Sequence, residues 1–246
     1  MRKVEIALNG EPTNVESGFT KMSDLYERLS IDSSVQWLYL DKNDDIDIPL
    51  LPDDHIVIHG GERIFSDDIN PQIGENPHVR NLVCPEFNGK KLEPGLDQCR
   101  ISSDDLCNKD AELASAKLFA DLQGQVDAFI PSGIALVIQE SDSYITIPDS
   151  GDEAVDLEAC SKAGRKPPKG AGSYKIKIEG EKYTVTESSL TGQAILALAS
   201  KTYEQYTLNQ KLHEGRRKTI ESEEEVGFSQ PGIERFEVVR RQAQQG

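Results

Sequence analysis

Residues 173–239 constrain most strongly what this chain can fold into. Two alternating segments, Tyr174–Ile178 and Lys182–Thr186, flank Glu179-Gly180, and alternation on both sides of an acidic-glycine turn predicts a β-hairpin. The segment SLTGQAILALASK follows, with apolar residues at helical spacing behind Ser and Thr residues that can cap a helix. Two short return strands are expected over 206–210 and 233–239. A hairpin, a helix and return strands predict a small α+β domain.

The same stretch resembles a known family. The segments YKIKIEGEKYTV, LTGQAILALA, YTLNQKL and PGIERFEVV, in this order, resemble the bacterial multiubiquitin-type ubiquitin-like proteins. The upstream run VDLEACSKAGRKPPKG is similar to the segment that precedes them in that family. The resemblance covers roughly residues 155–246. It implies a β-grasp (ubiquitin-like) fold over 173–239 and a bacterial operon that also encodes activating-enzyme, conjugating-enzyme and metalloprotease homologues.

The polar segment RRQAQQG, residues 240–246, is the candidate functional site. The resemblance implies conjugation through Gly246, which would be activated, carried as a thioester and joined to a target amine. Glycine suits this chemistry because it lacks a Cβ and leaves its acyl carbon unhindered. We expect a flexible tail, recognised by partner enzymes through Arg240, Arg241, Gln244 and Gln245. The arginines would pair with acidic side chains.

The tail departs from ubiquitin at one position. Ubiquitin ends in two glycines, whereas Gln245 precedes Gly246 here, and a partner that requires diglycine would reject that side chain. The alternative interpretation of the whole segment is ordinary fraying at a chain terminus, which any protein can show.

The first 66 residues predict a second β-grasp domain. Residues 3–15 alternate around Asn9-Gly10, a strong hairpin signal. Ser23 is expected to cap a helix over Asp24–Leu29, and strands are expected over Val35–Leu40 and Asp53–His59. An acidic linker, residues 67–78, would follow.

Gly60-Gly61 has two interpretations. The functional one is a processing site that resembles the diglycine of ubiquitin precursors. The structural one is a turn or bulge that requires positive φ, because the apolar residues Ile64 and Phe65 follow at once and a cleavable tail should protrude from the fold. The apolar residues favour the turn.

The middle region, residues 79–150, predicts either a divergent third β-grasp unit or a generic small α+β domain. We expect a hairpin around Asn88-Gly89, a helix from Ser103 or Asp110 through Leu122, and two strands, Ile134–Gln139 and Ser143–Ile147, joined by an acidic turn. Residues 151–172 are expected to be a Pro/Gly linker. It would be a plain spacer or a basic extended segment that packs on a partner's acidic groove. The predicted fold class is therefore α+β, with tandem small β-grasp domains and a flexible C-terminal tail.

The charge distribution argues against a nucleic-acid partner. The formal net charge is −16, and nucleic-acid affinity depends on contacts between basic residues and phosphates. Residues 1–169 hold 16 basic and 32 acidic residues, whereas residues 170–246 hold 11 of each. No apolar run approaches the roughly 18 residues that span a bilayer, and the N-terminal segment lacks a signal-peptide pattern. We therefore expect a soluble cytoplasmic protein without a membrane partner.

The sequence shows no pattern typical of an active site. It contains no Ser/His/Asp spacing, nucleophile elbow, P-loop or H-E-x-x-H. The cysteines include no C-x-x-C pair and do not interleave with the histidines as metal ligands do; they are Cys84, Cys99, Cys107 and Cys160. We expect no enzymatic activity, no cofactor and no metal.

The predicted function is that of a ubiquitin-like protein modifier. The resemblance implies as partners an activating-type enzyme, a conjugating-type enzyme and a metalloprotease-type deconjugase, acting on an unknown protein target, with phage defence as the setting. The alternative is a non-covalent, multi-domain adaptor in which the tail is incidental.

Overall fold

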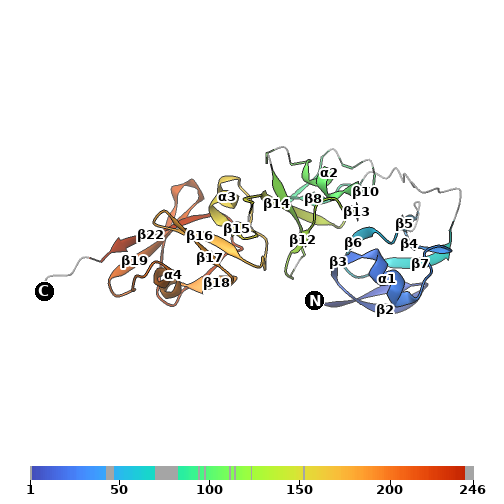
Figure 1. The fold of residues 1–246 in the computed structure, drawn as a ribbon, viewed down its shortest axis with the longest axis horizontal. Helices are drawn as coiled ribbons and strands as arrows, with labels where there is room; N and C mark the ends of the chain where they lie inside the picture. The colour runs from blue at the N-terminus through green and yellow to red at the C-terminus, as the bar shows by residue number, and fades with distance from the viewer. Residues whose placement is uncertain are drawn as a thin grey trace. The chain divides into compact units, whose positions relative to one another are not determined.

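A computed structural model describes residues 2–42, 47–69, 83–93, 95–96, 98–110, 112–113, 115–122, 124–151 and 153–241, with the side chains of residues 214 and 234 excepted (Figure 1). The chain divides into two compact units. The first unit comprises Met1–Asp110 and Leu118–Tyr144, and the second comprises Ala111–Lys117 and Ile145–Gly246.

The first unit opens with the predicted hairpin. Strand β1 (Lys3–Leu8) pairs antiparallel with β2 (Glu11–Glu16), and Asn9 and Gly10 form the turn with φ of 50° and 82°. Positive φ at both central residues gives the turn a twist that matches that of the strands. The hairpin prediction is thus confirmed.

Three further strands complete this sheet, in the order β2-β1-β7-β4-β5. The return strand β7 lies parallel to β1 and antiparallel to β4, and its Ile64 is buried. Helix α1 (Met22–Leu29) buries Met22, Leu25 and Tyr26; it begins two residues before the predicted helix, and Lys21, not Ser23, is its N-cap. The added strands are β4 (Gln36–Leu40), β5 (Ile48–Leu50) and β7 (Arg63–Asp68).

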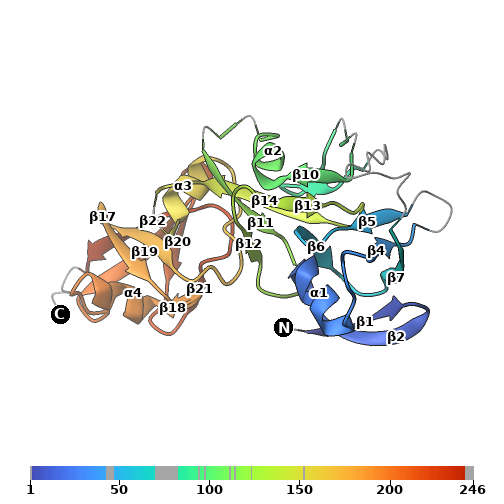
Figure 2. The ribbon, with the colours of Figure 1, turned by 45° about the vertical axis from the view of Figure 1, so that its right-hand side comes forward.

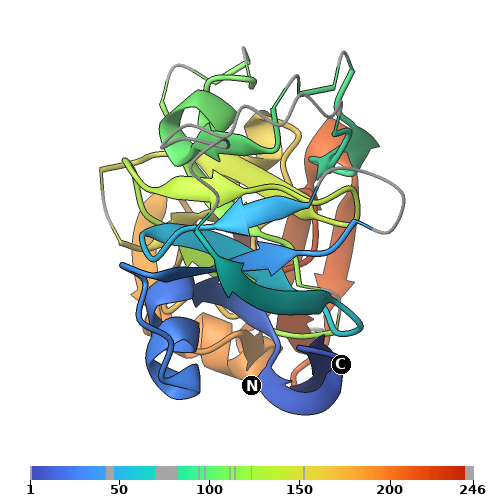
Figure 3. The same cartoon turned by 90° about the vertical axis from the view of Figure 1, so that its right-hand side faces the viewer.

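A second sheet of the first unit is made of two ribbons. Strand β3 (Gly18–Lys21) pairs with β6 (Asp54–Ile58), and β10 (Arg100–Ser102) pairs with β13 (Ala135–Val137), both antiparallel. The ribbons join where β6 and β13 run parallel, side by side in Figure 2 and seen from the side of the first unit in Figure 3. This pairing buries the apolar strands of both ribbons in one core.

The pairing of the ribbons differs from the predicted division at residues 67–78. Residues 1–66 and much of 79–150 share one sheet and one buried core, and β7 extends to Asp68. The sequence predicts β6 and β13 as strands of separate domains. Each has an antiparallel partner closer in the sequence, β3 for β6 and β10 for β13. The pairing of β6 with β13 joins residues about 80 positions apart, and no local sequence pattern predicts it.

The third sheet contains the predicted hairpin at Asn88-Gly89, formed by β8 (Glu86–Phe87) and β9 (Lys90–Lys91). The strand order is β12-β11-β14-β8-β9, and β14 runs parallel to β8. The boundary between the two units falls within β11 and β14. The remaining strands are β11 (Ala116–Ala120), β12 (Ala128–Ile130) and β14 (Ser143–Pro148).

The predicted helix through Leu122 is wrong. Helix α2 spans only Ser103–Cys107, and the later apolar residues form β11. Phe119 lies opposite Phe129 of β12, with ring centroids 5.5 Å apart, and such aromatic cross-strand pairs stabilise sheets. The two late strands, β13 and β14, also lie in different sheets and do not form the expected hairpin.

In the second unit the predicted 173–239 elements are present. The sheet has six strands: the order is β15-β16-β22-β19-β20, with β15 (Val155–Asp156) at one end, and β17 (Glu181–Val185) pairs with β16 (Tyr174–Ile178) off this path. Strand β16 runs parallel to β22. Ile195 and Leu196 of α4 (Gly192–Leu198) are buried. The other strands of this sheet are β19 (Tyr206–Leu212), β20 (Arg217–Ile220) and β22 (Ile233–Arg240), and a 3₁₀ turn, His213–Gly215, follows β19. A separate two-stranded ribbon consists of β18 (Ser189–Thr191) and β21 (Glu225–Gly227).

The three five-stranded arrangements share one order of elements. Each has a hairpin, a ribbon strand, a helix, two strands, a second ribbon strand and a return strand parallel to the first. The orders β2-β1-β7-β4-β5, β9-β8-β14-β11-β12 and β17-β16-β22-β19-β20 are equivalent position by position. This sheet-rich architecture with few, short helices fits β-grasp-like domains.

Residues 151–172, the expected spacer, carry secondary structure in the second unit. Strand β15 (Val155–Asp156) pairs parallel with β16, and α3 (Leu157–Lys162) buries Leu157 and Cys160. The Asp156 side chain caps α3 by accepting a hydrogen bond from the Ala159 N–H. Pro168 is buried, and its carbonyl accepts a hydrogen bond from the Tyr174 hydroxyl. The segment is packed because its apolar residues cover the start of the sheet.

Replacing Gly192, at the start of α4, by a residue with a Cβ should measurably lower stability. A Cβ added there would collide with the backbone carbonyl oxygen of Glu221, which is not a flexible side chain that can move away. We expect Gly192→Ala to destabilise the second unit by about 1–3 kcal/mol, the usual cost of overpacking, and to speed hydrogen exchange of the α4 amides. Gly172→Ala, at an exposed glycine with open space around it, is the control. Unchanged exchange in Gly192→Ala would contradict the prediction.

Candidate functional site

The predicted tail begins inside the last strand. Arg240 belongs to β22 and lies opposite Tyr206 of β19. The backbone N–H of Arg241 continues this pairing by donating to the carbonyl of Gln205 at 2.8 Å. The chain is therefore held to the sheet through Arg241, one residue beyond the strand.

The Arg241 side chain is also bound to its own domain. Its guanidinium carbon lies 4.5 Å from the centroid of the Tyr203 ring, a cation–π contact. Its Nε donates to the backbone carbonyl of Tyr206 at 3.2 Å. Together with the backbone bond, these contacts fix Arg241 at three points.

Tyr203 is held in turn. Its hydroxyl donates to the Glu221 carboxylate at 2.7 Å, and this hydrogen bond, aided by burial and by the charge of Glu221, raises the pKa of Tyr203 above its usual value. The ring that Arg241 covers is thus positioned by Glu221, the residue that follows β20. We call the set Arg241, Tyr203, Tyr206, Gln205 and Glu221 the tail anchor.

The part of the chain that carries the tail anchor matches a known family. Residues 174–241 match the model of the Multiubiquitin family. The match begins at the first residue of β16 and ends at Arg241, so it covers every strand of this sheet except β15. It supports a multiubiquitin-type domain in this part of the chain. The chain matches no curated protein.

The predicted site residues divide into two groups. Gln244, Gln245 and Gly246 lie outside the described residues. Arg240 and Arg241 are both exposed, but Arg241 also contacts the Tyr203 ring and the Tyr206 carbonyl of its own domain. The sequence reasoning missed Tyr203 and Glu221. The one available signal was the expected pairing of the strands at 206–210 and 233–239, which brings residues after 239 close to residues before 206.

Gly60 and Gly61 lie in the turn between β6 and β7, with φ of 105° and 87°. The Glu62 carboxylate accepts hydrogen bonds from the backbone N–H groups of His59, at 2.6 Å, and Gly60, at 2.9 Å. A Cβ on Gly60 would lie 3.0 Å from the Cβ of Val4. This geometry favours the turn over a processing site, because cleavage after Gly61 would remove β7, which completes the sheet.

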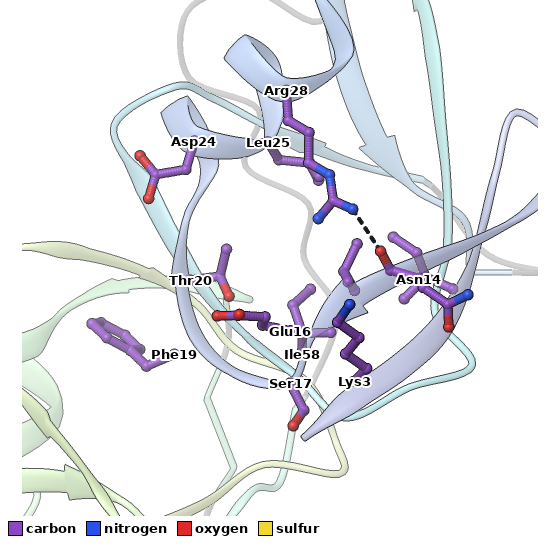
Figure 4. Close-up of a pocket in the computed structure, with 12 residues that line it drawn as sticks. Lys3, Asn14, Glu16, Ser17, Phe19, Thr20, Asp24, Leu25, Arg28 and Ile58 are labelled. Atoms are coloured by element: carbon purple, nitrogen blue, oxygen red, sulfur yellow. Dashed lines mark hydrogen bonds between the residues drawn. The ribbon is translucent and has the colours of Figure 1, made fainter. Parts of the chain in front are cut away.

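A cavity of about 450 Å³ lies in the first unit between the β1–β2 hairpin and α1 (Figure 4). Its floor is apolar, and its rim carries both charge signs. Arg28 extends from α1 and donates to the backbone carbonyl of Asn14 at 2.7 Å. The rim includes Lys3, Glu16, Asp24 and Arg28. The volume and the apolar floor of the cavity suit a small ligand or one apolar side chain. Because the rim carries both positive and negative side chains, it does not favour a ligand of either charge.

Three thiols, those of the buried Cys99 and Cys160 and the half-buried Cys107, are poor nucleophiles. Burial raises the pKa of Cys99 and Cys107 above the usual thiol value, and that of Cys160 to about 12. A thiol is nucleophilic as its thiolate, so these three are neutral near pH 7. Within the described ranges, no three His, Cys, Asp or Glu side chains lie close enough to hold a metal ion. In the same ranges, no helix has both the length and the apolar character that crossing a bilayer requires.

Proposed function

We propose that the chain is a ubiquitin-like protein modifier joined to its target through Gly246. The observation that carries the proposal is the multiubiquitin match over residues 174–241. In the structure Arg240 is exposed at the end of β22, and Arg241, also exposed, contacts the Tyr203 ring. Three equivalent strand orders support the further proposal that the chain holds three β-grasp domains in tandem.

The proposed reaction has three balanced steps. The Gly246 carboxylate attacks the α-phosphate of ATP on an activating-type enzyme, forming an acyl-adenylate and releasing pyrophosphate. A cysteine thiolate then displaces AMP and forms a thioester, which passes to a conjugating-type enzyme by exchange of thiols. An amine of the target finally attacks the thioester, forming an amide and releasing the thiol. A metalloprotease-type enzyme would hydrolyse this amide.

Intact mass spectrometry tests the proposal. The full chain is incubated with ATP and with the activating-type and conjugating-type enzymes of its own gene neighbourhood. We expect an enzyme adduct that a thiol reductant removes. It should be absent with Gly246→Ala and unchanged with Gly172→Ala, a substitution in open space. No adduct from an intact chain with an enzyme that forms adenylates would overturn the proposal.

One observation favours a second function, that of a non-covalent adaptor. The first unit holds 11 basic and 26 acidic residues, a formal charge of −15, whereas the second holds 16 and 17, a charge of −1. A strongly acidic unit attracts basic partners and speeds their association. An adaptor of this kind would bind its partner equally well with Gly246→Ala, whereas a modifier would lose its conjugates.

A further inference from the structure

Two pairs of opposite charges border the cavity between the β1–β2 hairpin and α1. Lys3 lies directly opposite Glu16 in the hairpin, and Asp24 and Arg28 are at positions i and i+4 of α1. Opposite charges at either spacing usually attract each other. Among the residues that the structure describes, none of these four side chains forms an ion pair. Each pair is in register, yet both of its charges lack an ionic partner.

The four charges are sorted by sign across the cavity. In Figure 4 the Lys3 and Arg28 side chains reach toward Asn14, and Arg28 is held there because its Nη2 donates to the Asn14 carbonyl at 2.7 Å. The carboxylates of Glu16 and Asp24 point to the opposite side (Figure 4). The cavity therefore has one positive side and one negative side.

The floor of the cavity is apolar. Ile6, Val15, Leu25 and Ile58 line it, and each is no more than 6% exposed. The volume of about 450 Å³ lies within the range of small-ligand sites. A ligand with an apolar body would therefore gain affinity by covering this floor.

Strand β2 presents hydrogen-bonding groups at the same place, because it is the outermost strand of its sheet. The Ser17 N–H donates to the Arg2 carbonyl. Residues of an antiparallel ladder alternate between facing their partner strand and facing away, so the backbone groups of Asn14 and Glu16 face away from β1. In the described part of the chain the Asn14 N–H has no hydrogen-bond partner, although Arg28 holds the carbonyl beside it. A carboxylate on the positive side of the cavity can accept a hydrogen bond from this N–H.

We propose that this cavity binds a short zwitterionic peptide with an apolar middle. Lys3, Arg28 and the Asn14 N–H hold its free carboxylate. Glu16 and Asp24 hold its free ammonium. About three extended residues place the two ends about 10 Å apart and the middle side chain on the floor. A ligand of one charge sign would meet repulsion on one side of the cavity, whereas a zwitterion meets the opposite charge on both. The site belongs to the first unit and is independent of conjugation.

Amide NMR shifts of the full chain test the proposal, with the tripeptide Ala-Leu-Ala as the probe. We expect saturating shifts in β2 and α1, with half-saturation below about 5 mM. The same tripeptide with an acetylated N-terminus and an amidated C-terminus has the same apolar body and no charged end. It should bind at least about fivefold more weakly, because each exposed charge contact that is lost costs about 2–5-fold in affinity.

Charge-removing variants assign each end of the peptide to its side of the cavity. Lys3→Gln combined with Arg28→Gln should weaken binding of the free tripeptide at least about threefold and leave binding of the C-amidated tripeptide nearly unchanged. Glu16→Gln combined with Asp24→Asn should do the same for the free and the N-acetylated tripeptide. Lys21→Gln removes an exposed cation of β3 that does not line the cavity and is the matched control.

Three results would overturn the proposal. One is the absence of saturating shifts in β2 and α1 at about 10 mM free tripeptide. Another is equally tight binding of the free and the doubly blocked tripeptide by the wild-type chain, which would assign the cavity to an internal segment of a partner chain. The third is a loss in either double variant that is the same for free and end-blocked tripeptides, because the substituted charges would then not contact the peptide ends.

Discussion

Arg100→Ala should destabilise the first unit by about 3–5 kcal/mol, the usual cost of removing one partner of a buried ion pair. Arg100 of β10 holds the Asp54 carboxylate of β6 by two hydrogen bonds, Nε to Oδ1 at 2.9 Å and Nη2 to Oδ2 at 2.5 Å. The Asp54 side chain is only 3% exposed. Without Arg100, a charged carboxylate would remain buried in the sheet that joins the two ribbons.

The chain offers a convenient probe of this unit. Trp37 of β4 is the only tryptophan in the sequence and lies in the first unit. Its fluorescence during urea unfolding therefore reports on that unit alone. Lys91→Ala, which removes an exposed pair with Glu140 in the same unit, should leave the midpoint nearly unchanged, since exposed pairs contribute little.

A second variant separates a lost pair from an unpaired charge. Arg100→Met combined with Asp54→Asn removes both charges and should restore most of the stability that Arg100→Ala loses, because replacing both partners is often nearly neutral. If the double variant is as unstable as Arg100→Ala, the unpaired buried carboxylate is not the source of the loss.

Local chemistry explains which parts of the fold the sequence predicts. The hairpins at Asn9-Gly10, Asn88-Gly89 and Glu179-Gly180 depend on two turn residues and on alternation beside them, and all three are present. The helix over 103–122 was wrong because Leu118, Phe119 and Ala120 fit an apolar helical face as well as a buried strand. Only the pairing of Phe119 with Phe129 decides between the two.

Non-local contacts explain what the sequence could not provide. Arg241 and Tyr203 are 38 positions apart in the sequence. Neither residue shows from its type or its neighbours that the two side chains will be in contact. The contact between Arg100 and Asp54 and the pairing of β6 with β13 are also invisible in the sequence. In both cases the fold, and not the neighbouring residues, determines which groups meet. The sequence therefore predicted only which segment, residues 240–246, forms the candidate site. The contacts of Arg241 with Tyr203 and Tyr206 are seen only in the structure.

The three ribbons show why only two of them pair. In the first unit the pairing strands β6 and β13 carry the apolar residues Ile56, Val57 and Leu136, which the joined sheet buries. The equivalent strand β21 reads Glu-Val-Gly, and its Glu225 is exposed. In the described part of the chain this ribbon remains two-stranded. A polar edge avoids strand addition, so this ribbon is not expected to pair with a further strand.

Asp142→Ala should be the other severe substitution, with an expected loss of about 3 kcal/mol in the first unit. Its side chain is fully buried and accepts hydrogen bonds from the backbone N–H of Gln139, at 2.9 Å, and the Tyr144 hydroxyl, at 2.8 Å. Removing the carboxylate leaves both buried donors unsatisfied, at about 1–3 kcal/mol each. Ser141→Ala, in the exposed part of the same turn, is the control.

The same carboxylate makes stability depend on pH. His59, in the equivalent turn of the first sheet, lies 2.8 Å from Asp142 through its Nε2. This hydrogen bond raises the pKa of His59 above its usual 6.5, against the opposing effect of burial and with help from the charges of Asp142 and Glu62. A pKa raised by folding means that the folded state binds the proton more tightly than the unfolded chain does. The stabilisation is therefore complete below about pH 6.5 and is lost as the pH rises through the folded pKa.

His59→Gln isolates this contribution from the general charge of the unit. Both proteins keep the acidic surface whose repulsion also varies with pH, so the informative quantity is the difference between their unfolding free energies, followed by Trp37 fluorescence from pH 5.5 to pH 9. We expect wild type to exceed His59→Gln most at the acidic end and the gap to narrow as the pH rises. A gap that stays constant or widens toward pH 9 would show that folding does not raise the pKa of His59 and would contradict the prediction.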